Sequence, residues 1–228
     1  MRGSPNELLE RELRERITRR RFSHSIGVRD TAVALAGMYG CDEEKAGAAG
    51  LLHDIARDMP LVTMQSIVTM KGIVTTQSVV VTRGIVTRQN NSSGQNDTLL
   101  REALFSSPGL LHAYAGRIIA QRDFGVRDED ILKSIELHTT GGRGMTVLNK
   151  VVFVADYIEP GRSLRGVETA RAIAQRSLDE AVLYIFRSMF RKLIADGVYI
   201  CVNTLLGYNE LVLGSGNTVR DFSMKQTL

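Results

Sequence analysis

The chain contains four histidines, and each is expected to lie near the end of a helix. One of them, His53, is followed directly by Asp54 inside the apolar stretch GLLHDIA. A buried carboxylate needs a cation or several hydrogen-bond donors beside it, so Asp54 has few purely structural explanations. In chain order, the candidate metal ligands are His24, His53, Asp54, His112, His138 and Asp156. Imidazole and carboxylate groups together suit Fe, Mn, Co or Zn and argue against a thiolate site.

The number of candidate ligands favours two metal ions over one. A single histidine is more often structural than ligating, but this ordered set leaves no histidine over. Asp54 would bridge the two ions. The other ligands divide into His24, His53 and Asp156 on one ion, and His112 and His138 on the other. Two ions about 3.5–4 Å apart share a hydroxide nucleophile and hold phosphoryl oxygens, which predicts hydrolysis of a phosphate ester or phosphoanhydride.

The elements that must position these residues read as helices. Gly40 is a natural C-terminal stop for the first long helix, and a capping box from Ser177 to Glu180 precedes another. Expected helices cover residues 25–39, 42–54, 108–123, 128–138, 146–159 and 177–193, with a further one inside 1–20. Strands do not alternate with helices in this pattern. We therefore predict an all-α fold.

A low-complexity segment interrupts the helical pattern. Residues 66–89 are four near-copies of a six-residue unit, SIVTMK, GIVTTQ, SVVVTR and GIVTRQ. Val and Thr favour short extended pieces, and four such units are too few to stack as a β-helix. We interpret residues from about 62 to 97 as an insertion looped out of a helical domain. We expect turnover to survive removal of residues 63–96.

Composition and charge indicate a cytoplasmic protein without a membrane partner. The 228 residues carry 29 basic and 25 acidic side chains, a net charge of +4. Neither an apolar run of about 18 residues nor a signal sequence is present, and Cys41 and Cys201 fit no disulfide framework. The densest basic patch consists of Arg14, Arg16, Arg19, Arg20 and Arg21. A solvated helix face explains this patch, and without interleaved aromatic residues we do not expect nucleic-acid binding.

Several motifs together resemble the HD-domain superfamily of metal-dependent phosphohydrolases. Within it, they are most similar to the bacterial YqeK-type symmetrical diadenosine-tetraphosphate hydrolases. The similar segments are RFSHSIGV, YGCDEEKAGAAGLLHDIARD, PGLLHAYAG, ELHTTGGRGMTVLNKVVFVADYIEPGR, GVETAR and SLDEAVLYIF. On this basis we expect an Arg-rich N-terminal helix (1–20), an HD-domain helical bundle (21–213) carrying the insertion, and a flexible C-terminal tail (214–228).

The resemblance implies a specific reaction. It implies a bound metal pair, iron in members of the family, and the same six ligands. It also implies that a metal-bridged hydroxide cleaves diadenosine tetraphosphate at its centre to give two ADP. Mn, Co or Zn would also suit the ligands, and the ions are divalent or mixed-valence. A dinucleoside polyphosphate is thus the expected partner, and the sequence leaves a homodimer open.

Positive charge near the substrate is the remaining requirement. Central cleavage expels a nucleoside diphosphate, which leaves readily, so charge around the developing oxyanions matters most. Candidates are Arg57, Arg143, Lys150 and Arg162; for each, an ordinary surface cation is the alternative. Thr139 and Thr140 either donate to phosphate or cap a helix end. Arg57 and Cys201 depart from the family pattern, which tends to have Lys and His at these positions.

Two other functions remain open. One is an HD-type nucleotidase or phosphodiesterase that acts on another nucleotide. The chain has HTTGG where a cyclic-dinucleotide phosphodiesterase would show His-His-Glu and Gly-Tyr-Pro motifs, and IARD where an alarmone hydrolase usually shows Glu-Asp after the His-Asp pair. The other is a metal-stabilised, non-catalytic regulator that binds RNA through the Arg-rich helix. Salt-dependent RNA binding without turnover would favour it.

Overall fold

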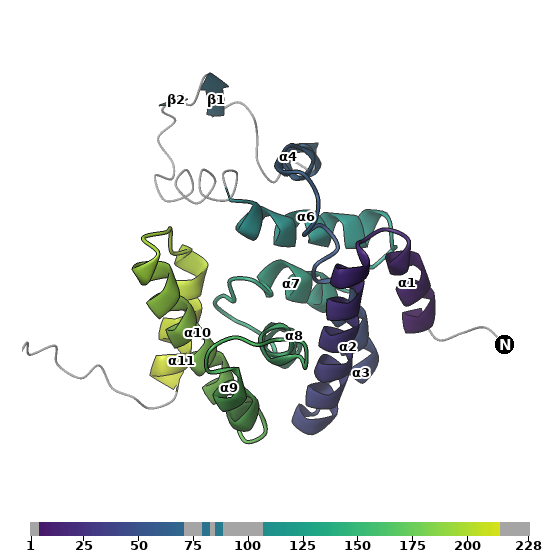
Figure 1. Cartoon of the computed structure of the whole chain (residues 1–228), viewed down its shortest axis with the longest axis vertical. Helices are drawn as coiled ribbons and strands as arrows, with labels where there is room; N and C mark the ends of the chain where they lie inside the picture. The colour runs from purple at the N-terminus through teal and green to yellow at the C-terminus, as the bar shows by residue number, and fades with distance from the viewer. Residues whose placement is uncertain (1–4, 71–78, 83–84, 89–106, 215–228) are drawn as a thin grey trace, which may run out of the picture.

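The fold is a bundle of helices, as predicted (Figure 1). In a computed structural model of the chain, the structure describes residues 5–70, 79–82, 85–88 and 107–214. The helices in these ranges are α1 (Pro5–Arg14), α2 (Arg19–Tyr39), α3 (Glu43–Leu52), α4 (Leu61–Met70), α6 (Pro108–Arg122), α7 (Glu129–Leu137), α8 (Val147–Ile158), α9 (Val167–Ala174), α10 (Leu178–Ala195) and α11 (Val202–Gly214). Strands β1 (Val79–Thr82) and β2 (Ile85–Arg88) form one hairpin.

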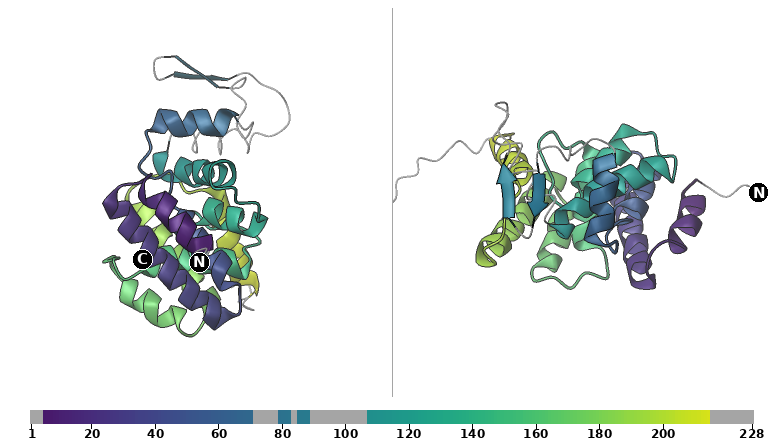
Figure 2. Two further views of the ribbon diagram at one scale, coloured as in Figure 1. Left: turned by 90° about the vertical axis from the view of Figure 1, so that its right-hand side faces the viewer. Right: turned by 90° about the horizontal axis from the view of Figure 1, so that it is seen from above.

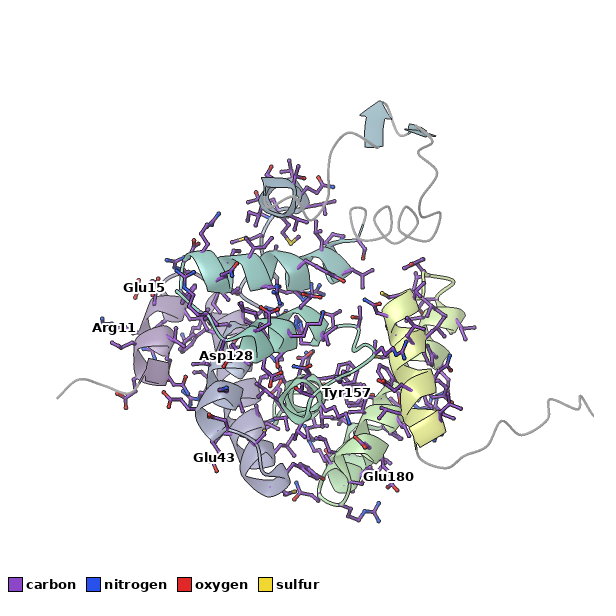
Figure 3. All side chains as sticks on the ribbon, turned by 180° about the vertical axis from the view of Figure 1, so that it is seen from behind. Arg11, Glu15, Glu43, Asp128, Tyr157 and Glu180 are labelled. Carbon is purple, nitrogen blue, oxygen red and sulfur yellow. The ribbon has the colours of Figure 1, made fainter. Side chains whose placement is uncertain are left out.

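Helix α8 occupies the centre of the molecule. It contacts α2, α3, α7, α9 and α10, which surround it in Figure 1. Most of its residues are buried, including the run from Val151 to Ala155. A helix that is apolar on nearly every side belongs in a core, and Figure 3 shows side chains filling the space around it, with Tyr157 labelled beside the helix. The candidate ligand Asp156 is therefore carried by a largely buried helix at the centre of the fold.

Side-chain caps fix where the helices begin. Asp42, Asp128 and Ser177 each accept a hydrogen bond from a backbone N–H in the first turn of the helix that follows. Thr146 and Asn149 form a complete capping box at the start of α8. Such caps satisfy donors that the first turn leaves unpaired. The predicted helix starts at these four positions are therefore confirmed.

The N-terminal boundary differs from the sequence interpretation. Helix α1 ends at Arg14, and α2 begins at Arg19, six residues before the expected start at residue 25. The physical reason is Thr18, whose Oγ1 accepts from the N–H of Arg21 and caps α2. Part of the arginine patch thus belongs to the helix that carries His24, rather than to a separate N-terminal helix.

The repeat segment is also only partly as expected. Its first unit is helical, because Ser66 to Met70 complete α4, whereas extended structure was predicted there. Met64 and Val68, four residues apart, are buried, and α4 packs on α6. Later units form the antiparallel hairpin, with Val79 opposite Arg88, beyond α4 (Figure 2). The rest of the proposed insertion, and the tail from residue 215, lie outside the described residues.

Helix α11 packs on the loop that follows His138. A Cβ atom on Gly207 would lie 2.5 Å from the carbonyl oxygen of Gly142, so only glycine allows this approach. Farther along α11, Glu210 Oε2 accepts a hydrogen bond from the N–H of Gly144 at 2.6 Å. The loop between α7 and α8 is consequently held from outside by the last described helix.

Two expectations from composition concern cysteines and membranes. Cys41 and Cys201 are free thiols, the first half-buried and the second buried. Among the described residues, every helix is too short or too polar to cross a bilayer.

Candidate metal centre

The six predicted ligands come together at one place in the helical bundle. Five helices or their ends supply them, although the residues span positions 24 to 156 of the sequence. They are His24 on α2, His53 and Asp54 at the end of α3, His112 on α6, His138 at the end of α7 and Asp156 on α8. Four of these side chains are buried, whereas His24 and Asp156 are partly accessible. Groups of histidine and aspartate atoms in this cluster lie close enough together to hold metal ions.

The first half of the cluster joins α2, α3 and α8. His24 Nε2 lies 3.2 Å from His53 Nε2 and 3.0 Å from Asp156 Oδ1. His53 Nε2 is 3.7 Å from the same carboxylate oxygen. These three side chains form one of the groups able to hold an ion.

The second half joins α6 and α7, and Asp54 lies between the two halves. His112 Nε2 is 3.0 Å from His138 Nε2. Asp54 Oδ1 lies 3.1 Å from His112 Nε2 and 3.4 Å from His138 Nε2. Its other oxygen, Oδ2, is 3.5 Å from His53 Nε2 and 3.7 Å from His24 Nε2. One carboxylate oxygen therefore faces each histidine pair, which is the arrangement a bridging ligand requires.

Outer hydrogen bonds orient three of the imidazoles. The Nδ1 atom of His53 donates to the carbonyl oxygen of Gly50, and the Nδ1 atom of His138 donates to that of Ile135, both at 2.7 Å. His112 Nδ1 lies 3.1 Å from the carbonyl oxygen of Pro108. A carbonyl oxygen only accepts hydrogen bonds, so in His53 and His138 Nδ1 carries the proton and, in the neutral ring, Nε2 carries the lone pair. His112 Nδ1 faces both the Pro108 carbonyl and the Arg57 guanidinium, which only donates.

This tautomer makes the cluster suitable for cations. The Nε2 atoms of each pair lie 3.0–3.2 Å apart, and in each pair one of them, that of His53 or of His138, offers a lone pair. Such a lone pair can bind a cation, and ligating histidines usually have their other nitrogen held in this manner. The donor set present therefore fits metal ions.

The local sequence explains the inward orientation. His53 and His138 both cap the C-terminal end of a helix, and each bonds the carbonyl three residues earlier. The last carbonyls of a helix have no partner within it, so an imidazole at this position satisfies one carbonyl and directs Nε2 away from the helix. The two ligands are thus presented by the same local structure.

The pKa directions of the two carboxylates agree with ligation. Burial tends to raise the pKa of Asp54, but the charge of His53 and contacts with His112 and His138 outweigh it, so the pKa lies well below its usual value. Burial also tends to raise the pKa of Asp156, but the contact with His24 outweighs it, and that pKa is lowered too. The histidines differ: burial lowers the pKa of His112, whereas at His138 contact with Asp54 outweighs burial and raises the pKa. Charged carboxylates and neutral imidazoles are the forms that bind metal, so ligation by His138 favours loss of its proton.

Three of the other predicted site residues border the cluster. Arg162 donates from Nε to the carbonyl of Asp156 at 2.8 Å and also contacts the Asp156 carboxylate. Arg57 lies with its guanidinium 3.2 Å from His112 Nδ1. Thr139 Oγ1 is 3.0 Å from His138 Nε2. These side chains are placed to contact a molecule that binds at the cluster.

Three predicted site residues make their contacts with residues outside the cluster. Lys150 Nζ donates to Asp179 at 2.6 Å, at the start of α10. Six residues on a helix amount to about 600°, so Lys150 and Asp156 point in different directions. Thr140 is buried, and its hydroxyl donates to the carbonyl of Gly141. Arg143 has a side chain that is 76% exposed and lies near Glu210.

Two residues at the cluster were not among the sequence candidates. Arg21 contacts Asp54 through one guanidinium nitrogen and Asp58 through the other. Glu159 is buried, and its Oε1 lies 3.1 Å from His24 Nδ1. Arg21 precedes His24 by three residues and shares its face of α2, but the sequence does not show that this face turns inward. Glu159 lies just beyond the end of α8, three residues after Asp156.

Comparison with known proteins gives concordant results. The HD domain family model matches residues 21–161. A protein of Bacillus subtilis (strain 168) named "Bis(5'-nucleosyl)-tetraphosphatase, symmetrical" is 34% identical over 89% of this chain and 95% of its own length. A protein of the same name from Halalkalibacterium halodurans is 33% identical over 86% of this chain and 91% of its own.

A solved structure agrees in fold. It is titled as a predicted HD superfamily hydrolase involved in NAD metabolism from Clostridium acetobutylicum. It has a TM-score of 0.76 and 35% identity, and the match covers 91% of this chain and 97% of that one. The family model spans more than half of the chain, and its matched range contains all six residues of the cluster. The chain therefore belongs to the HD domain family.

Proposed function

We propose that this protein hydrolyses diadenosine tetraphosphate symmetrically, with two ADP as products. The observation that carries the proposal is Asp54, whose two oxygens face two separate histidine pairs. A two-ion centre of this kind suits hydrolysis of phosphoanhydrides. The substrate is supported by relatives that are named as symmetrical bis(5'-nucleosyl)-tetraphosphatases and that match this chain over most of its length. Two free thiols and a nucleotide substrate fit a cytoplasmic location.

The metal content is part of the same proposal. We infer two ions, held by His24, His53 and Asp156 on one side and by His112 and His138 on the other, with Asp54 shared. Iron is the metal expected from the family resemblance, and Mn, Co and Zn suit the same ligands. When bound, such a pair supplies an activated water and positive charge at the phosphoryl group.

The protein's own cations would bind the polyphosphate. Arg21, Arg57 and Arg162 surround the cluster, and two of them contact a carboxylate of Asp54 or Asp156. Once these carboxylates ligate metal, the guanidinium groups have donors available for phosphate oxygens. Thr139 offers a further hydroxyl donor. These groups hold the substrate and stabilise charge on the departing diphosphate, which needs little protonation.

Product analysis tests the proposed reaction. Protein reconstituted with Fe or Mn should convert diadenosine tetraphosphate to ADP alone, as measured by anion-exchange chromatography. His53→Ala and Asp54→Ala should abolish turnover, because each removes a ligand. Asp179→Asn, which changes an exposed carboxylate, is the matched control. ATP and AMP as products would reject symmetrical cleavage, and turnover of other nucleotides alone would support the broader nucleotidase or phosphodiesterase alternative.

The RNA-binding alternative has weaker support. Within the arginine patch, Arg14 pairs with Glu10, and Arg16 pairs with both Glu12 and Asp123. Arg21 points into the cluster rather than outward. Paired guanidinium groups offer less charge to a phosphate backbone, so the patch is a poorer nucleic-acid surface than its composition suggests.

A further inference from the structure

Glu159 is a buried acid that the proposed reaction does not use. It directly follows α8, and the residue is 5% exposed. Its Oε1 lies 3.1 Å from His24 Nδ1, and its Oε2 accepts from the N–H of Gly161 at 2.5 Å. A buried carboxylate without a role would be costly. Arg162 Nε lies farther off, 3.9 Å from Oε1. The shorter contact with His24 therefore indicates what Glu159 does.

His24 needs a partner that the other three histidines do not. Their Nδ1 atoms bond to backbone carbonyls three or four residues earlier in the chain. His24 instead lies within the second turn of α2 and shares its Nδ1 with a side chain 135 residues away. A carboxylate is a stronger acceptor than a carbonyl, so this imidazole is held by a stronger outer partner than its neighbours.

Two glycines provide the space for this contact. Gly27, one turn beyond His24, would place a Cβ 2.6 Å from Glu159 Oε2. Gly161 would place one 3.0 Å from the same atom. Glycine is a poor helix former, and Gly27 is not among the glycines with positive φ, so backbone conformation does not explain it. The space that the Glu159 carboxylate occupies explains why this position is glycine.

We propose that Glu159 is a positioning residue that controls how tightly the His24, His53 and Asp156 half of the centre binds metal. It accepts the Nδ1 proton of His24 and thereby holds the ring so that Nε2 lies 3.0 Å from Asp156 Oδ1. Gly27 is part of the same arrangement, since it admits the carboxylate. The inference rests on the proposed metal centre. It implies that a side-chain carboxylate supports His24 in one half of the centre, whereas backbone carbonyls support both histidines of the other half.

The first test changes only the charge of Glu159. Glu159→Gln keeps the shape but removes the carboxylate that orients His24. Losses from such outer partners are typically about 10–100-fold in metal affinity. In chelator competition followed by elemental analysis, the variant should retain one ion per chain where the wild type retains two. A thermal melt of the metal-free proteins supplies the second readout, because a merely structural role would lower that midpoint and leave metal affinity unchanged.

The second test uses matched glycine variants of α2. Gly27→Ala should displace the Glu159 carboxylate and weaken the same ion. Gly37→Ala is the control, since its Cβ would lie 2.8 Å from a carboxylate oxygen of Glu43, which is exposed and free to rotate away. It should leave both ions in place. This pair keeps the proposal testable if Glu159→Gln does not fold.

The outcomes separate this inference from the proposed function. If Glu159→Gln and Gly27→Ala both bind the two ions with wild-type affinity, the proposed role of Glu159 is overturned and the proposed metal centre is not. A wild-type protein that binds no metal would overturn the metal centre together with this inference. Metal binding is measured without nucleotide, so failure to cleave diadenosine tetraphosphate would leave the result readable.

Discussion

At the residue scale, the cluster shows which ligands a sequence can reveal. All six predicted ligands meet at one place, and His53, Asp54, His138 and Asp156 among them stand at or near helix ends. Arg21 and Glu159 escaped because their partners are 33 and 135 residues away. Charge alone did not separate Arg21 from its exposed neighbours. The missing information was which face of α2 turns inward, and packing against α3 and α8 decides that.

Arg21 permits a prediction at this scale. Arg21→Met should lower kcat/KM for diadenosine tetraphosphate by about 10–100-fold, the loss expected for one charged hydrogen bond. Metal content should not fall, because the change removes a competitor for the Asp54 carboxylate. Steady-state kinetics and elemental analysis measure the two effects. Arg20→Met, at an exposed adjacent position, is the control, and equal losses in both variants would contradict a specific role.

At the element scale, four capped helix starts were predictable, whereas the start of α2 and the helical state of α4 were not. Asp42, Asp128, Thr146 and Ser177 mark helix starts through side-chain chemistry that is local in sequence. In α4, Val and Thr favour strands, yet burial of its apolar face on α6 prevails. Propensity is a weak guide where tertiary packing competes with it.

The position of α4 changes the expected result of deletion. Removal of residues 63–96 takes away Met64 and Val68, which are buried next to the helix that carries His112. Loss of a buried side chain of this size costs about 2–5 kcal/mol, so this deletion should reduce stability and metal content. Removal of residues 71–96 spares α4 and should preserve both, together with turnover. Urea unfolding and elemental analysis compare the two proteins, and identical behaviour would show that α4 contributes nothing.

At the scale of the whole molecule, metal and fold are expected to be coupled. The proposed ligands come from five helices, so the two sites exist only when the bundle is assembled. At a free ion concentration 100 times Kd, binding adds about 2.7 kcal/mol per site to the free energy of unfolding. Chelation should therefore lower the urea midpoint of the wild type and have much less effect on His53→Ala. A wild-type midpoint that is insensitive to chelator would contradict this coupling.

The hairpin and α4 divide the chain between the ligands. His24, His53 and Asp54 precede this segment, and His112, His138 and Asp156 follow it. Each proposed ion draws on both sides, since Asp156 joins the first pair of histidines and Asp54 joins the second. Neither part of the chain, before or after this segment, supplies all the proposed ligands of either ion. Metal binding, and with it the proposed catalysis, therefore requires both parts to be folded together.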